Sequence, residues 1–270
     1  MVSRQWASDR IFLLTLALLV LVTVAAWAGV IAQAASMPMG GSAMDAEMSG
    51  GRGPLVTPAG LVAFVAAWVV MMATMMLPSA APMILLYRTV ARGQSARGHP
   101  LVPTWVFVLG YLVVWAAFGV LVYLAGQLVG AALGGDGRLA EWAPYGVALV
   151  LLAAGAYQFT PLKQVCLRTC QSPLGFLMVH WRPGPGGAFR MGVEHGSYCT
   201  GCCWGLMAVL VAAGAMELAW VLLIALVVAA EKLLPHGQWA ARITGLVLLG
   251  LGALIAVQPQ LALALRGQGM

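Results

Sequence analysis

Long apolar runs separated by short polar stretches follow one another along the whole chain. Most of these runs are long enough, as helices, to cross a hydrocarbon core of about 30 Å. They predict seven helices, over about residues 11–31, 58–77, 101–124, 144–159, 189–213, 218–234 and 242–257. We therefore predict an all-α fold, a polytopic transmembrane helix bundle that forms a single domain over residues 1–270 and contains no separate soluble domain.

One alternative to this count is a single long helix across residues 204–230. That helix would place Glu217 near the centre of the bilayer, where a charged side chain costs several kcal/mol. A helical hairpin over 189–234, with the turn at "GAME" (residues 214–217), avoids that cost, so we favour seven helices.

The distribution of cations favours the same count and gives an orientation. Hydrophobic residues make up 62% of the chain and charged residues only 8%, so the net charge of +6 is better explained by membrane orientation than by nucleic-acid binding. With the N-terminus inside and the C-terminus outside, eleven of the fourteen cations lie on the inner side: Arg4, Arg10, Arg88, Arg92, Arg97, Lys163, Arg168, Arg182, Arg190, Lys232 and Arg242. Arginine dominates over lysine among them, which is typical of a GC-rich bacterial genome, and we expect a multi-pass protein of the bacterial inner membrane.

The first apolar run has a second interpretation. Arg4 and Arg10 precede it, and "AQA" at residues 32–34 resembles a signal-peptidase site. The run is long for the core of a signal peptide, so we favour an uncleaved helix. Cleavage would leave six helices in the same orientation.

Metal-binding side chains form a stripe on the helix expected at 189–213. Because a helix turns about 100° per residue, Met191, His195, Cys199 and Cys202 lie on one face, with Cys203 at its edge. Each of these residues alone would be ordinary packing. Together they form a set of thioether, imidazole and thiolate groups that selects Cu(I), and the imidazole and thiolates also suit zinc. The stripe therefore predicts a metal or redox site.

Other chemically unusual residues are expected at the same inner side of the membrane. The helix over 58–77 carries two methionine pairs with helical spacing, and two prolines, Pro78 and Pro82, are expected to end it with a kink or re-entrant turn. A Pro/Gly-rich inner loop is expected over 160–187. The further metal ligands that we expect are Met71, Met72, Met75 and Met76, and the accessory residues are Glu194, Tyr198, Cys166, Cys170, Glu231 and His236.

A second group of methionines lies in an outer loop, residues 37–54. Met37, Met39, Met44 and Met48 alternate there with acidic and small residues. Thioethers need no deprotonation to bind Cu(I), so this loop could collect copper; a flexible linker with chance methionines is the alternative.

Four stretches carry a resemblance to a known family. They are "MMATMMLPSAAPM", "YQFTPLKQVCLRTCQSPLGF", "GAFRMGVEHGSYCTGCCW" and "EKLLPHG", which span residues 71–237. The chain resembles the predicted metal-binding integral membrane proteins defined by domain of unknown function 2182. The resemblance implies a polytopic bacterial membrane protein with a metal site, and it implies no particular reaction.

The hypothesis that we favour is a membrane protein that binds or moves Cu(I) and is not an enzyme. Its expected partners are the lipid bilayer and a soluble metal chaperone or a membrane complex, and no nucleic acid. One alternative is a membrane thiol–disulfide oxidoreductase with Cys199 and Cys202 as the redox pair and Cys166 and Cys170 as the shuttle pair. The other is a zinc- or haem-bearing subunit of a larger membrane complex.

Overall fold

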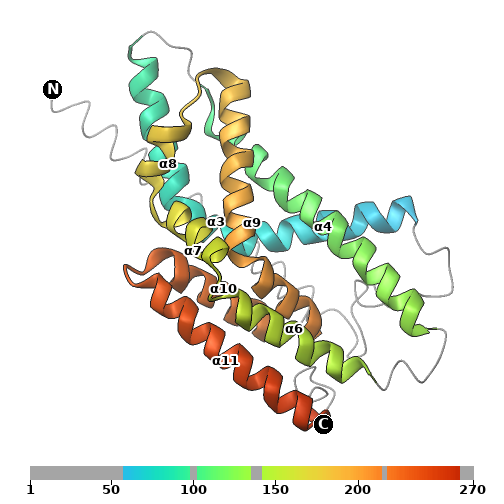
Figure 1. The fold of residues 1–270 in the computed structure, drawn as a ribbon. Helices are drawn as coiled ribbons and strands as arrows, with labels where there is room; N and C mark the ends of the chain where they lie inside the picture. The colour runs from blue at the N-terminus through green and yellow to red at the C-terminus, as the bar shows by residue number, and fades with distance from the viewer. Residues whose placement is uncertain (1–56, 98–101, 135–141, 215–217, 262–270) are drawn as a thin grey trace.

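The computed structural model describes residues 57–97, 102–134, 142–214 and 218–261, and every regular element in these ranges is a helix. The all-α prediction is thus confirmed for this part of the chain (Figure 1). The helix expected at 11–31 with its signal-peptide alternative, the outer loop with its methionines, and the turn at 214–217 lie wholly or mostly outside the described residues. The helices are α3 (Pro58–Ser95), α4 (Thr104–Gly134), α6 (Ala143–Tyr157), α7 (Pro161–Gln171), α8 (Pro173–His180), α9 (Gly184–Gly214), α10 (Leu218–Leu233) and α11 (Gly237–Val257).

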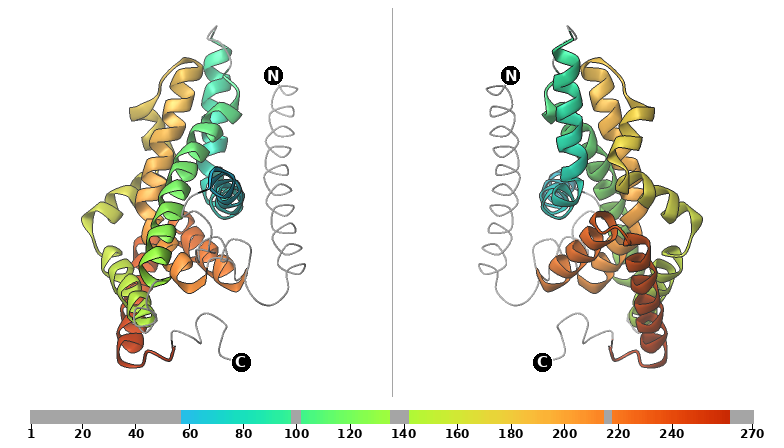
Figure 2. Two further views of the ribbon diagram at one scale, coloured as in Figure 1. Left: turned by 90° about the vertical axis from the view of Figure 1, so that its right-hand side faces the viewer. Right: turned by 90° about the vertical axis from the view of Figure 1, so that its left-hand side faces the viewer.

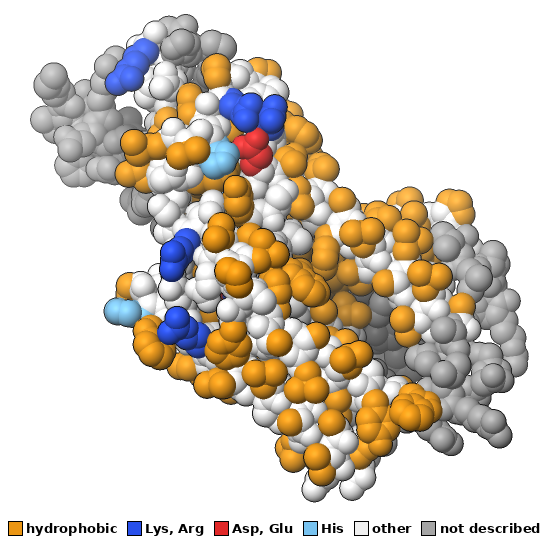
Figure 3. All heavy atoms as spheres, viewed as in Figure 1, with side chains coloured by type: hydrophobic (Ala, Val, Ile, Leu, Met, Phe, Trp, Pro, Cys, Tyr) orange, Lys and Arg blue, Asp and Glu red, His pale blue; other side chains and the backbone are white. Residues whose placement is uncertain are grey.

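Four of the described helices, α3, α4, α9 and α11, are long and apolar enough to cross a membrane. The pair α6 and α7, bent by 65° at a short break, would make a fifth span. Hydrophobic side chains cover most of the face in Figure 3, where charged side chains are few. A multi-pass membrane protein fits these observations, whereas the count of seven helices and the orientation of the termini stay predictions.

The prediction that Pro78 and Pro82 end the second helix is wrong. Helix α3 continues through both prolines to Ser95. It bends instead: Figure 2 shows its first part end-on and its later part lengthwise. Each proline lacks an amide hydrogen and crowds the carbonyl one turn earlier, which bends a helix that neighbouring helices hold in place. The hydroxyls of Thr74 and Ser79 donate to the carbonyls of Val70 and Met76, and such back-bonding favours bending as well.

The segment 160–187, expected to be a loop, contains the short helices α7 and α8. Thr160 caps α7, because its hydroxyl accepts a hydrogen bond from the Lys163 amide at 3.3 Å, and Pro161 occupies the first helical position. Pro173 similarly opens α8. The prolines that suggested a loop therefore mark the starts of two helices.

Glycines allow two pairs of helices to pack closely. Where α4 crosses α9, a Cβ at Gly192 would collide with the carbonyl oxygen of Phe107, and one at Gly110 with that of Phe189. Helices α6 and α11 lie side by side in Figure 1, and Gly155 and Gly245 play the same role there. Small residues at helix contacts are typical of membrane bundles, because association there depends on close packing. The α4–α9 crossing places Tyr111 of α4 against Cys199 of α9, in the site described next.

Candidate metal centre

The polar stripe of α9 faces the protein interior. His195, Cys199, Cys202 and Cys203 are each at most 2% exposed, and Met191 is fully buried. The Cys202 and Cys203 thiols both donate to the carbonyl oxygen of Cys199, at 3.1 and 2.9 Å. These bonds to the backbone of the preceding turn fix the directions of both thiols.

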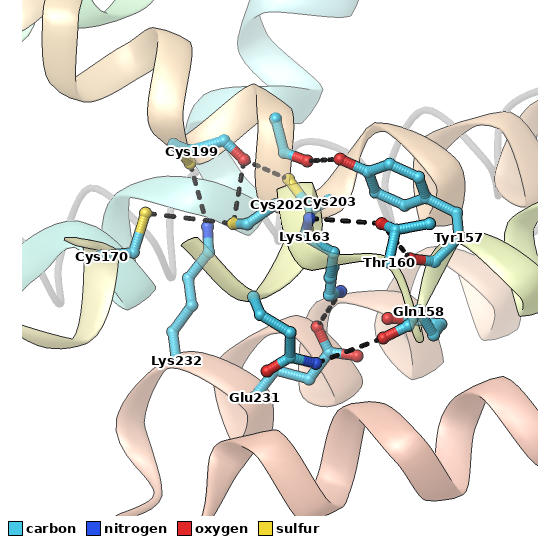
Figure 4. A network of polar contacts seen from close by, with 12 residues as sticks. Tyr157, Gln158, Thr160, Lys163, Cys170, Cys199, Cys202, Cys203, Glu231 and Lys232 are labelled. Atoms are coloured by element: carbon cyan, nitrogen blue, oxygen red, sulfur yellow. Dashed lines mark hydrogen bonds and ion pairs between the residues drawn. The ribbon is translucent and has the colours of Figure 1, made fainter. Parts of the chain in front are cut away.

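Cys199 has the most polar surroundings of these cysteines. The ammonium nitrogen of Lys232, on α10, lies 2.9 Å from its sulfur, and the hydroxyl of Tyr111, on α4, lies 3.0 Å from it. Figure 4 shows Lys232 reaching up from α10 to this sulfur. The same nitrogen lies 3.7 Å from the thioether sulfur of Met76 on α3. Cys199 of α9 thus contacts α4 and α10 directly, and Lys232 extends this group of contacts to α3.

Helix α7 brings two further cysteines to α9. The Cys170 sulfur lies 3.9 Å from that of Cys202 (Figure 4). Cys166 is buried against Gly201, where a Cβ would lie 2.8 Å from its sulfur. All five cysteines carry free thiols.

A cavity of about 180 Å³ lies beside these side chains. It is bounded by the bend of α3, by the end of α7, by α9 and by α10. The lining residues that carry donor groups for a metal are His195, Cys199, Cys170 and Met83. The imidazole nitrogen Nδ1 of His195 is buried and has no hydrogen-bond partner in the described structure. A buried polar atom without a partner costs free energy, and no described residue holds the His195 imidazole by a hydrogen bond at this nitrogen.

Helix α7 is held in place by two contacts with one residue of α10. The ammonium of Lys163 pairs with the carboxylate of Glu231 at 2.6 Å, and both side chains are buried. The side-chain amide of Gln171 donates to the carbonyl oxygen of Glu231 at 2.7 Å. Gly237 permits this approach, because a Cβ there would collide with the same carbonyl. Lys163 and Gln171 stand at the two ends of α7, so Glu231 anchors the helix that carries Cys166 and Cys170.

The structure places three of the predicted accessory residues, Glu194, Tyr198 and His236, outside the lining of the cavity. Glu194 precedes His195 but is not part of the cavity lining, and it pairs with Arg190 at 3.1 Å and with Arg182 at 3.3 Å. Tyr198 contacts the rings of Phe176 and His180. His236 is exposed at the start of α11. Met71, Met72, Met75 and Met191 are packed in the hydrophobic core, so among the predicted methionine ligands only Met76 has a described polar contact with the site.

Sequence reasoning missed Lys163, Lys232 and Tyr111 as parts of the site. The two lysines were assigned to the inner side of the membrane. In the structure Lys163 is 1% and Lys232 7% exposed, and both contact buried side chains. The signal for Lys232 was its place beside a glutamate at the end of an apolar helix, since ionisable groups in such segments are functional by default. Nothing in the sequence marks Tyr111, which reaches the site only through the α4–α9 crossing.

The described fold and site define a class: helical proteins of membrane-spanning composition with a buried, sulfur-rich polar centre. A family model described as copper chaperone (PpoB2) matches residues 65–255. The chain belongs to this copper chaperone family, and the match includes all the residues of the centre. No match was found among curated proteins or solved structures. The family supports copper as the metal and does not test the assignment to domain of unknown function 2182.

Proposed function

We propose that this chain is a membrane copper-handling protein that binds Cu(I) in the cavity between α3, α7, α9 and α10. The observation that carries the proposal is the buried cavity lined by Cys199 and His195. The two residues are four apart on one helix and therefore neighbours on one face. A thiolate and an imidazole are ligands that Cu(I) accepts, and the thioether of Met83, which lines the same cavity, is a further soft group.

Zinc fits this centre less well. Structural zinc takes four ligands in tetrahedral geometry, and catalytic zinc takes three protein ligands. His195, Cys199 and Cys170 line one cavity, but no three His, Cys, Asp or Glu side chains among the described residues are arranged to hold a metal ion together. Cu(I) accepts fewer ligands and also binds thioethers, so we favour it over zinc.

The test is a Cu(I) titration of the purified, reduced protein in detergent against a chromophoric Cu(I) chelator. We expect Cys199→Ser to weaken Cu(I) binding by about tenfold or more, because serine removes the thiolate while nearly preserving the shape of the side chain. The matched control is Cys203→Ser, on the same helix and equally buried, whose thiol points to the Cys199 carbonyl and does not line the cavity. Equal affinities for the wild type and Cys199→Ser would refute the site.

A further inference from the structure

Two thiols other than the Cys199 thiol of the proposed copper site lie at or beside the cavity. The sulfurs of Cys170 and Cys202 are 3.9 Å apart and come from α7 and α9. The Cys202 thiol is held by the Cys199 carbonyl, whereas Cys170 lines the cavity directly. A disulfide needs an S–S distance of about 2.05 Å, so a movement of about 2 Å would join them.

The charge around the cavity favours the lower oxidation state of copper. The Lys232 ammonium lies 2.9 Å from the Cys199 sulfur, and among the described residues no carboxylate pairs with it, because the adjacent Glu231 binds Lys163. A fixed positive charge in a buried place repels Cu(II) more strongly than Cu(I). Sulfur ligands act in the same direction, since soft donors prefer Cu(I). An entering Cu(II) ion would therefore meet a site that favours its reduction, next to a dithiol.

We propose that this protein also reduces Cu(II), with the thiols of Cys170 and Cys202 as the electron source. Two Cu(II) ions each accept one electron and become Cu(I). The two S–H bonds break, one S–S bond forms between Cys170 and Cys202, and two protons pass to water. An external dithiol would restore both thiols by thiol–disulfide exchange. This inference rests on the proposed function, because the Cu(I) produced is the cargo of the site.

The experiment mixes the reduced, detergent-solubilised protein with Cu(II) under anaerobic conditions. The Cu(II) electron paramagnetic resonance signal measures reduction, and peptide mass spectrometry after alkylation locates the disulfide. For the wild type we expect two Cu(II) ions to be lost for each disulfide, and the disulfide to join Cys170 to Cys202. We expect Cys170→Ser to reduce Cu(II) at least about tenfold more slowly. Cys166→Ser, on the same helix but away from the cavity lining, should match the wild type.

A persistent Cu(II) signal in the wild type would overturn the inference, as would wild-type rates in Cys170→Ser or a disulfide that includes Cys199. If Cys170→Ser does not fold, Cys202→Ser replaces it, because serine can still donate to the Cys199 carbonyl. Titration with Cu(I) on the same samples separates the two proposals. A wild type that reduces Cu(II) but does not retain Cu(I) contradicts the proposed function alone, and one that binds Cu(I) but leaves Cu(II) unreduced contradicts the reductase alone.

Discussion

Replacement of Lys163 by methionine is expected to lower the free energy of unfolding by about 3–5 kcal/mol. Methionine has a similar length but no charge, so the Glu231 carboxylate would stay buried without its ammonium partner. Lys163 is the ion-pair partner of that carboxylate in the described structure, and the other groups that act on it, Lys232 and the Gln158 side chain, form no ion pair with it. The change should also loosen α7 and with it Cys170.

The measurement is thermal or denaturant unfolding of the detergent-solubilised protein. The double variant Lys163→Met with Glu231→Met should recover most of the loss, because it removes both buried charges together. Arg190→Met is the matched control at an exposed ion pair, where Glu194 retains Arg182, and we expect a change below about 1 kcal/mol. A Lys163 variant as stable as the Arg190 variant would contradict the role assigned to the buried pair.

Gly192→Ala is expected to lower the free energy of unfolding by about 3 kcal/mol. The new Cβ would collide with the carbonyl oxygen of Phe107, so α4 and α9 would have to separate. Backbone cannot rotate away as the end of a flexible side chain can. Separation would also draw the Tyr111 hydroxyl away from the Cys199 sulfur, so we expect weaker Cu(I) binding in any folded fraction.

The control for this prediction is the same substitution at Gly250, in the middle of α11. A Cβ at Gly250 meets no atom within 4 Å, so Gly250→Ala should be neutral or stabilising by up to about 1 kcal/mol through helix propensity. Thermal unfolding of both variants in one detergent checks the difference. If the two curves coincide, the close α4–α9 contact is not a determinant of stability.

Local patterns in the sequence predict much of this molecule. The apolar runs locate α3, α4, α6, α9, α10 and α11, because a helix that faces lipid or a core needs a long apolar segment. The spacing of His195, Cys199 and Cys202 predicts that they share a buried face, which depends only on helix geometry. That this face binds metal remains a prediction.

What sequence reasoning missed depends on tertiary contacts. Pro78 and Pro82 can end a helix or bend it, and only the packing around α3 decides between these outcomes. A lysine at the end of an apolar helix suits either the membrane surface or a buried partner. Lys232 has a buried partner, because the Cys199 sulfur of α9 lies within reach of its ammonium group. Tyr111 joins the site because glycines let α4 approach α9.

The burial of both lysines has a practical consequence. The chain contains two lysines, Lys163 and Lys232, and neither is accessible in the folded protein. Amine-reactive reagents should therefore leave both side chains of the native protein almost unmodified. Reaction at Lys232 would require the contact with Cys199 to open, so the rate of its acylation would measure how often the cavity opens, without a metal, a mutation or a spectroscopic label.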